Sequence, residues 1–454
     1  MRAVCAILAL FTSSALLTEE RSAVALPADA PPLRTEVPRA CRGGEAGPRA
    51  GQLDPSFGGA GTGIARLSFG ADDDGGFFDL DVAGDAIVAA GWGLGGVGGT
   101  RFRVARLTRS GAPDPHFGVR GMVTTSWAAS TRDYVFATAV GHQRDGGIVA
   151  IGWRDQFGTG TPDVALARYA PDGSLDDDFG DGGKALLDLG GNEEIRSGLV
   201  TRDNRIVAVG QRDGRLLIAR ATADGALDTS FARPRGYRTV VTLGRSSVAE
   251  AVAVDRVGRL VVVGYVNIGG QRDMVVVRLT GSGAFDPSFG RGGVVVAGDP
   301  AINERAVAVA LSPDGGIVVA GDAGPDGARD FQVRRFLPDG SPDLRFGREG
   351  VAASRTTRGD DQAEDMALLP GGAVLVAGNG GEGDEAGPLL ARYGCAGALD
   401  PAFGHGGVLP VNLGESGQLH TVRAISDDQV LLGGGDVGMS PGPGTYGVVA
   451  RMWM

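Results

Sequence analysis

The stretch LDPSFGGAG at residues 53–61 sets the pattern for nearly the whole chain, because variants of it recur along the sequence. The variants are PDPHFGVRG at 113–121, LDDDFGDGG at 175–183, LDTSFARPRG at 227–236, FDPSFGRGG at 285–293, PDLRFGREG at 342–350 and LDPAFGHGG at 399–407. We call this motif the signature. Subtracting the numbers of its phenylalanines gives steps of 60, 62, 52, 58, 57 and 57 residues between Phe57, Phe117, Phe179, Phe231, Phe289, Phe346 and Phe403. A period of this size indicates a repeat architecture.

The sequence between two signatures predicts four short strands. In the fifth unit strands a, b, c and d are 293–297 (GVVVA), 305–311 (RAVAVAL), 317–320 (IVVA) and 330–337 (DFQVRRFL). Strand c recurs as IVAIG at 148–152, IVAVG at 206–210, LVVVG at 260–264, VLVAG at 374–378 and VLLGG at 430–434. The valines, isoleucines and flanking glycines favour strand over helix. We therefore expect the four strands of one unit to form one antiparallel sheet.

The number of repeats predicts an all-β fold, a seven-bladed β-propeller of four-stranded antiparallel blades over residues 51–454. One small sheet cannot bury both of its faces, and radial stacking of similar sheets does so. An open solenoid is the competing arrangement, but its terminal repeats are usually atypical caps. Here the ends complement each other, because the first signature has no strand d before it and the last strand d, 446–452, has no signature after it.

An arginine accompanies the signature at a constant spacing. It lies 11 residues before the phenylalanine in Arg106, Arg168, Arg220, Arg278, Arg335 and Arg392. This spacing predicts a repeated contact between a guanidinium group and the signature aspartate, which arginine can grip with two hydrogen bonds; solvated strand-edge arginines are the alternative. Arg451 has no aspartate after it, so we expect it to reach Asp54. The seven signature phenylalanines are expected to pack between sheets as scaffold.

These repeats of LDPSFG-x-GG, followed by a strand, PDG-[GK]-IVVAG and an arginine-bearing strand, resemble the delta-60 repeat family. The resemblance covers residues 53–454. It implies a bacterial, often exported, β-propeller, and it brings no catalytic residues with it. Departures are Ala232 in place of the glycine after Phe231, and Pro113 and Pro342 in place of the leading leucine.

The N-terminal region predicts export. Residues 1–25 have a basic start, an apolar run and a small-x-small cleavage site, which is typical of a signal peptide. A membrane anchor is the alternative, but the run is shorter than the ~20 residues that a spanning helix needs. Residues 26–50 are rich in Pro, Ala and Gly and are expected to form a linker. We expect a protein that is secreted, periplasmic or at the cell surface of a bacterium.

Composition narrows the classes of partner. The formal net charge of -11 argues against nucleic acid as a partner, and no later stretch is apolar enough to span a membrane. We expect a monomer with a protein or glycan ligand whose identity the sequence does not give. Without the signal peptide, Cys41 and Cys395 remain; a disulfide between them and two unpaired thiols both stay open.

Binding is expected on one face of the propeller. In an antiparallel a-b-c-d sheet the a–b and c–d loops emerge on one face, and the b–c turns and signatures emerge on the other. The loops at 92–101, 153–163, 378–388 and 433–446 differ in length and content, as binding loops on a scaffold do. Acidic residues near this face suggest a cationic partner, divalent ions or mere solubility: Asp72, Asp73, Asp74, Glu193, Glu194, Glu304, Asp360, Asp361, Glu364, Asp365, Asp384 and Glu385.

Two hypotheses follow, a non-enzymatic binding or interaction module and, alternatively, a hydrolase or lyase that acts on an extracellular polymer at the central channel. No catalytic residue, cofactor or metal ligand is assigned. Asp72–Asp74, and Asp176–Asp178 with Asp181, lack the alternating calcium-loop pattern. The four histidines, His116, His142, His405 and His420, belong to no recognisable catalytic motif. Three or more ionisable side chains converging at the channel mouth would favour the enzyme, and a shallow acidic rim would favour binding.

Overall fold

The computed structural model describes residues 46–454, except for 60, 69–74, 95–98, 128–132, 157–159, 241–243, 300, 382–385, 415–416 and 437–445. These residues all belong to one compact unit, Pro38–Met454. The predicted signal peptide, Cys41, most of the predicted linker, Asp72–Asp74, Asp384 and Glu385 lie outside the described residues.

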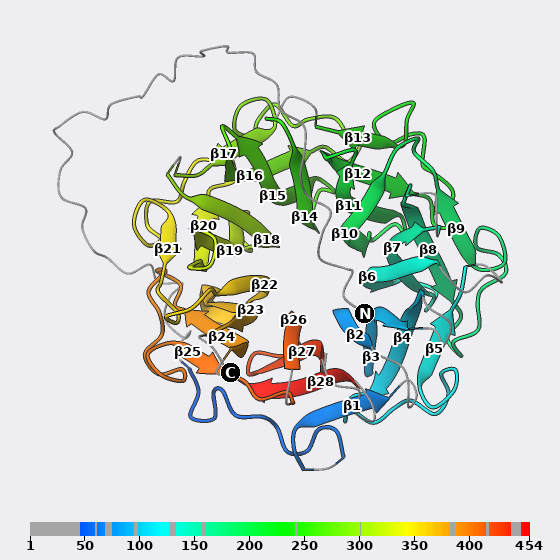
Figure 1. The fold of residues 1–454 in the computed structure, drawn as a ribbon, viewed down its shortest axis with the longest axis horizontal. Helices are drawn as coiled ribbons and strands as arrows, with labels where there is room; N and C mark the ends of the chain where they lie inside the picture. Colours follow the sequence, from blue (N-terminus) through cyan, green and yellow to red (C-terminus); the bar gives the residue numbers. More distant parts are fainter. Residues whose placement is uncertain are drawn as a thin grey trace. The chain divides into compact units, whose positions relative to one another are not determined.

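The described chain is an all-β protein, a propeller of seven four-stranded antiparallel sheets. The strand nearest the channel in each blade is β2 (Gly75–Ala83), β6 (Tyr134–His142), β10 (Glu193–Val200), β14 (Ser247–Val254), β18 (Asn303–Leu311), β22 (Gln362–Leu368) or β26 (Gly417–Ala424). These inner strands contact one another in that order and close from β26 back to β2, as Figure 1 shows.

Three further strands complete each blade outward from the inner strand. The second strands are β3 (Ala86–Leu94), β7 (Ile148–Asp155), β11 (Ile206–Arg212), β15 (Leu260–Ile268), β19 (Ile317–Gly324), β23 (Val374–Gly380) and β27 (Gln429–Asp436). The third strands are β4 (Thr100–Thr108), β8 (Asp163–Tyr169), β12 (Arg215–Ala221), β16 (Gln271–Leu279), β20 (Asp330–Phe336), β24 (Gly387–Tyr393) and β28 (Tyr446–Trp453). The outer strands are β5 (Met122–Thr125), β9 (Lys184–Leu187), β13 (Tyr237–Thr239), β17 (Val294–Ala297), β21 (Val351–Ala353), β25 (Val408–Pro410) and β1 (Ile64–Ser68). A 3-10 turn, η2 (Pro370–Gly372), follows β22.

The expectation that strand a shares a sheet with the b, c and d strands that follow it is wrong. In the fifth unit strand a is β17, and β17 pairs with β16, the strand before the signature. The signature folds back onto that preceding strand; in the next unit the amide of Asp343 donates to the carbonyl of Arg335, and the amide of Arg335 donates to the carbonyl of Gly350. Because this hairpin places the next strand beside the previous one, strand a is the outer strand of the preceding blade.

The two ends of the chain meet in one blade. The N-terminal strand β1 pairs with β28, with Ile64 opposite Ala450 and Ser68 opposite Tyr446. The blade that contains β26, β27 and β28 therefore receives its outer strand from the start of the chain (Figure 1). This pairing closes the ring, as the complementary ends predict.

The core is divided into clusters that lie between neighbouring blades. Each of seven buried clusters combines apolar side chains of two adjacent sheets, and each contains one signature phenylalanine. These phenylalanines are at most 1% exposed, and full burial of such a ring stabilises the fold by roughly 1.5–3 kcal/mol. The residue after the phenylalanine has a positive φ, including Ala232 at 45°, which explains the glycine in the other signatures.

Candidate functional site

Each inner strand contains a β-bulge at the same place. In β2 the pairing with β3 skips Phe78, so that Phe77 and Asp79 face consecutive residues of the neighbouring strand. A bulge leaves one residue unpaired and redirects its side chain. The seven skipped residues are Phe78, Thr138, Arg196, Glu250, Val307, Glu364 and His420. All of them line one cavity of about 520 Å³ in the channel, and we call them the bulge ring.

The glycine that ends the strand c motif explains the bulge. A Cβ atom on Gly321 would lie 1.7 Å from the carbonyl oxygen of Arg305 on the bulged strand. Equivalent glycines would place a Cβ 1.8–2.1 Å from the corresponding carbonyl oxygen at Gly91, Gly152, Gly210, Gly264, Gly378 and Gly434. Glycine inside a strand commonly marks a close approach of another backbone. The repeated glycine is therefore the sequence signal of the bulge ring.

The cavity opens toward the face from which the a–b and c–d loops emerge. The bulge ring lies in the first half or at the midpoint of each inner strand. The cavity also contacts the end of β7 through Trp153 and the start of β16 through Arg272. The chain enters each inner strand from an a–b loop, and β7 ends at a c–d loop. The sequence predicts the variable-loop face as the place for binding and the central channel as the place for catalysis. The structure joins the two in one cavity.

One arc of the cavity is aromatic. The rings of Phe136 and Trp153 lie 4.8 Å apart between centroids, with 30° between their planes. Phe78 meets His420 edge-on at 5.2 Å. Burial lowers the pKa of His420 to about 4, so its imidazole is neutral near pH 7. These four residues belong to three consecutive blades, those that begin with β26, β2 and β6.

The opposite arc is charged. Arg196, Glu250, Arg305 and Glu364 come from β10, β14, β18 and β22, which are consecutive in the ring. Arg305 is held by Asp322, with Nη2 2.8 Å from Oδ2, and also donates to the carbonyl of Ala363. Because the ring has seven blades, the middle of this arc lies across the channel from β2.

Burial shifts the pKa values of the two glutamates of the charged arc upward. Burial raises the pKa of Glu364 to about 7 against the attraction of Arg305, and the nearby Asp322 and Glu250 raise it further. Burial also raises the pKa of Glu250, which Arg196 and Arg305 oppose. A carboxyl group that titrates near neutrality can donate or accept a proton at physiological pH. The arc therefore offers guanidinium donors together with one carboxyl group, that of Glu364, whose charge can change near neutral pH.

The other end of the channel holds polar contacts that join blades. A second cavity of about 490 Å³ is lined there by the later halves of inner strands. Arg423 of β26 forms an ion pair with Asp365 of β22 at 2.8 Å, forms another with Asp79 of β2, and donates to the carbonyl of Leu80. Nδ1 of His142 lies 2.7 Å from Oδ2 of Asp81. These groups are engaged with one another, so they stabilise the ring.

The structure pairs every signature aspartate with an arginine. The ion pairs are Arg451–Asp54, Arg106–Asp114, Arg168–Asp176, Arg220–Asp228, Arg278–Asp286, Arg335–Asp343 and Arg392–Asp400. The second carboxylate oxygen accepts the amide two residues on, as the amide of Ser56 shows for Asp54 at 3.0 Å. Arg451 also covers the ring of Phe57 and donates to the carbonyl of Arg109 in the next blade. The signature thus joins neighbouring blades.

Three of the acidic residues near the loop face are buried in the part of the chain that the structure describes. Glu193, Glu304 and Asp361 are at most 1% exposed. Glu304 accepts hydrogen bonds from Gln332 and from the amide of Asp299, and Asp361 accepts them from the loop before β22. The carboxylates of Glu304 and Asp361 thus hold the loops in place, and the suggestion of a cationic partner or divalent ions at this face stays a prediction.

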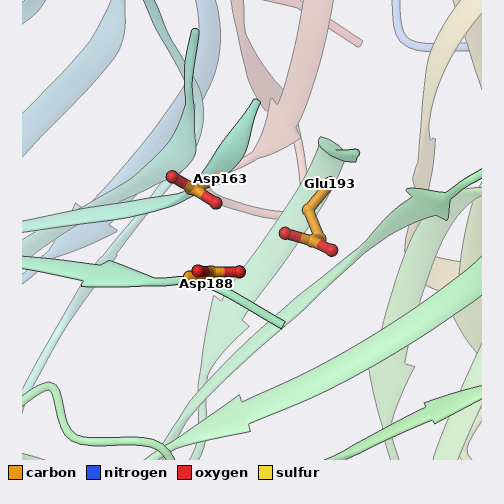
Figure 2. Close-up of side chains that lie close together, drawn as sticks. All are labelled: Asp163, Asp188 and Glu193. Carbon is orange, nitrogen blue, oxygen red and sulfur yellow. The ribbon is translucent and has the colours of Figure 1, made fainter. Parts of the chain in front are cut away.

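One acidic cluster has the spacing of a metal site. Carboxylate oxygens of Asp163, Asp188 and Glu193 lie within 4.8 Å of one another, and Figure 2 shows the three side chains converging from neighbouring segments. Oε1 of Glu193 already accepts a hydrogen bond from Nε of Arg212, with 3.1 Å between the two atoms. Calcium takes six to eight oxygens, and three acids with an arginine among them resemble an internal ion-pair network more than a calcium site.

The structure places the remaining residues that the sequence singled out outside the cavity lining or outside the described residues. Cys395 is disulfide-bonded, so the alternative of a free thiol is wrong there; Cys41, which the sequence offers as its partner, lies outside the described residues. Asp176 accepts the amide of Asp178 as well as Arg168. His116 and His405 lie in signatures, away from the cavity lining. In the part of the chain that the structure describes, no helix has the length and hydropathy to cross a membrane.

Comparison with known proteins agrees with the fold. A family model described as "Domain of unknown function (DUF5122) beta-propeller" matches residues 86–117, 143–179, 201–231, 258–289 and 312–346. No curated protein matches the chain.

Among solved structures, a protein of unknown function from Dyadobacter fermentans is similar with 12% identity and a TM-score of 0.45, over 86% of this chain and 98% of that one. The β-propeller domain of the Trilobed protease from Pyrococcus furiosus has 11% identity and a TM-score of 0.41, over 84% and 94%. The α-L-arabinanase of Penicillium chrysogenum, solved with arabinobiose, has 11% identity and a TM-score of 0.42, over 86% and 98%. At these values no activity or ligand follows for this chain. The chain is a β-propeller repeat protein, with five segments similar to the DUF5122 propeller repeat.

Proposed function

We propose that this protein is an exported, non-enzymatic β-propeller that binds a saccharide in the cavity lined by the bulge ring. The observation that carries the proposal is the combination of aromatic faces and polar donors around a cavity of about 520 Å³. Most ligand sites are concave and have apolar walls with a few placed polar groups. The apolar face of a sugar ring can stack on Phe136 and Trp153, while its hydroxyl groups reach the charged arc.

Binding of soluble oligosaccharides, measured by calorimetry after a glycan-array screen, tests this proposal. Substituting Trp153→Ala should weaken binding about tenfold, since an aromatic contact contributes roughly 0.5–1.5 kcal/mol beyond its buried area. Tyr134→Ala is the matched control, because Tyr134 is an aromatic residue at the start of β6 that is 44% exposed and does not line the cavity. Binding that survives Trp153→Ala, or that Tyr134→Ala reduces equally, would contradict the proposed location.

A hydrolase or lyase that acts on an extracellular polymer is the second candidate. Arg196, Glu250, Arg305 and Glu364 converge on one cavity, which meets the criterion of three or more ionisable side chains set for an enzyme. The binding module is proposed first because the sequence has no recognisable catalytic motif and because the aromatic arc suits stacking of a sugar ring. A carboxyl group with a pKa of about 7, such as Glu364, suits a general acid. Catalysis would be established if the wild type releases new chain ends from a polysaccharide and the Glu364→Gln variant still binds the polysaccharide but releases none. Saccharide binding without such release would establish the binding module.

We also propose that the repeats belong to the delta-60 family and that the protein leaves the cytoplasm. The repeated LDPSFG-x-GG phrase supports the family, and the apolar run of residues 1–25 supports export. Fractionation of the native bacterium, with sequencing of the mature N-terminus, tests export. A mature protein that retains residue 1 in the cytoplasmic fraction would contradict it.

A further inference from the structure

The charged arc contains more guanidinium groups than a neutral sugar requires. Arg196, Arg272 and Arg305 all line the cavity. Arg272 extends over the ring of Tyr265 at 5.2 Å, and the side chain of Arg196 is 49% exposed to the channel solvent. A guanidinium group has a planar fork of donors that matches a carboxylate better than it matches a single hydroxyl.

We propose that the saccharide in this cavity carries a carboxylate, as uronic acids do, and that Arg196, Arg272 and Arg305 recognise that group while the aromatic arc stacks on the sugar ring. This inference rests on the proposed function and names its ligand class. It also accounts for a cavity in which Phe78, Phe136 and Trp153 lie on one arc and the arginines on the other, since a uronic acid has an apolar ring face and an anionic edge.

The local charge depends on the channel glutamates. Three carboxylates surround the arginines inside the cavity region, Glu250, Glu364 and the buried Asp322, and Glu194 pairs with Arg196 at 3.3 Å. Each of these carboxylates that is ionised weakens the attraction of the three arginines for an anionic ligand. Protonation of Glu364 removes one of these negative charges, so the arginines attract the anion more strongly.

The groups around Glu364 support this change in charge. Arg305 from β18, Asp322 from β19, Glu250 from β14 and Asp365 from β22 itself act on it, and His420 from β26 lines the same cavity in its neutral form. Burial raises the pKa of Glu364 to about 7. Since a sugar carboxylate stays ionised in mild acid, the site takes up its ligand as pH falls below neutrality.

Calorimetry of the purified protein tests the inference. The ligands are oligosaccharides of galacturonic, glucuronic and mannuronic acid, each compared with the neutral oligosaccharide of the same linkage. At about pH 5.5 we expect one acidic series to bind at least about tenfold more tightly than its neutral counterpart, and this advantage to fall about tenfold at about pH 8. Glu364→Gln should remove most of the loss at the higher pH.

Arg196→Ala should weaken acidic ligands about tenfold and leave neutral ligands unchanged. Arg245→Ala is the matched control, because Arg245 is an exposed arginine before β14 that does not line the cavity. Thermal unfolding of both variants verifies that they fold. Equal or tighter binding of neutral sugars overturns the inference and leaves the proposed function standing, whereas failure of every saccharide to bind overturns both.

Discussion

The guanidinium group of Arg451 lies 2.9 Å from the carboxylate of Asp54, although 397 residues separate the two along the chain. The hydrogen bonds from Ser56 and Arg451 hold the pKa of Asp54 below its usual value, in spite of burial, which acts in the opposite direction. The same contact joins the arginine and the signature within each of the other blades. The ring is therefore closed by the interaction that organises every repeat.

Substituting Arg451→Ala should destabilise the protein by about 3 kcal/mol, because it leaves the buried carboxylate of Asp54 without its charged partner. Urea unfolding measures the loss. Hydrogen exchange should become faster in β1 and β28, where the two ends of the chain pair. Arg106→Ala, which breaks the equivalent pair inside the first blade, is the control and should leave exchange in β1 unchanged. Unaltered protection of β1 in Arg451→Ala would show that the contact contributes nothing to closure.

Substituting Gly321→Ala should cost at least about 3 kcal/mol, since overfilling a packed site is destabilising and here the obstacle is backbone. The added Cβ would lie 1.7 Å from the carbonyl oxygen of Arg305, so the bulge that carries Val307 must move. Gly387→Ala is the control, because a Cβ there has no atom within 4 Å, and it should change stability by less than about 0.5 kcal/mol. Similar unfolding midpoints for the two variants would refute the close-approach explanation.

Stability should decline as pH rises through the titration range of Glu364. Its pKa is about 7 in the folded protein and 4.5 without the fold, so the folded state holds a proton that the unfolded state has lost between these values. The contribution of Glu364 to the free energy of unfolding therefore falls as the pH rises between these two pKa values, and it is constant at lower pH. Glu364→Gln removes the group, and we expect the wild type to lose about 2 kcal/mol more than the variant between pH ~4.5 and pH ~8.

Urea midpoints of both proteins at the two pH values measure this difference. Glu349→Gln alters an exposed glutamate in the last signature but one and should retain the wild-type profile. Parallel profiles for the wild type and Glu364→Gln would mean that Glu364 does not titrate in this window.

Substituting Arg423→Met should destabilise the ring by about 2 kcal/mol near pH 8, because Asp79 and Asp365 then lose their shared cation. Burial raises the pKa of Asp79 to about 6 even with Arg423 present. Removing the cation raises this pKa further, so the defect should shrink in mild acid, where Asp79 is protonated. Chemical unfolding at both pH values measures it. Adding Asp79→Asn to Arg423→Met should restore part of the stability near pH 8, and no rescue would contradict the role of the carboxylate.

Much of the architecture could be predicted because its signals are local and repeated. The spacing of the signature phenylalanines indicates the number of blades, and the arginine 11 residues earlier identifies the ion pair. The assignment of strand a to the following sheet failed because a pattern of short strands does not show which neighbour each one pairs with. In the structure β17 joins β16 through the hairpin of the signature.

The cavity was harder to predict from the same signals. The sequence names Glu364 only as one of the acidic residues near the loop face and does not single out Glu250. The bulges turn both side chains into the channel, and the alternation of their strands does not show this. Side chains along a strand point alternately to its two faces. One extra residue at a bulge therefore reverses the direction of every side chain that follows it in the strand. The strand c glycine marks where this happens, and reading it as a close approach would have located the bulge ring.

The amino-acid sequence by itself determined that similar β-sheets repeat and that each interface between them buries one phenylalanine. It also determined that Arg451 pairs with Asp54 from the other end of the chain. These properties depend on short spacings that recur along the sequence. The tertiary structure decided which residues meet. Arg196, Glu250, Arg305 and Glu364 come from four different blades, and no local spacing relates residues that only the closure of a ring brings to one cavity.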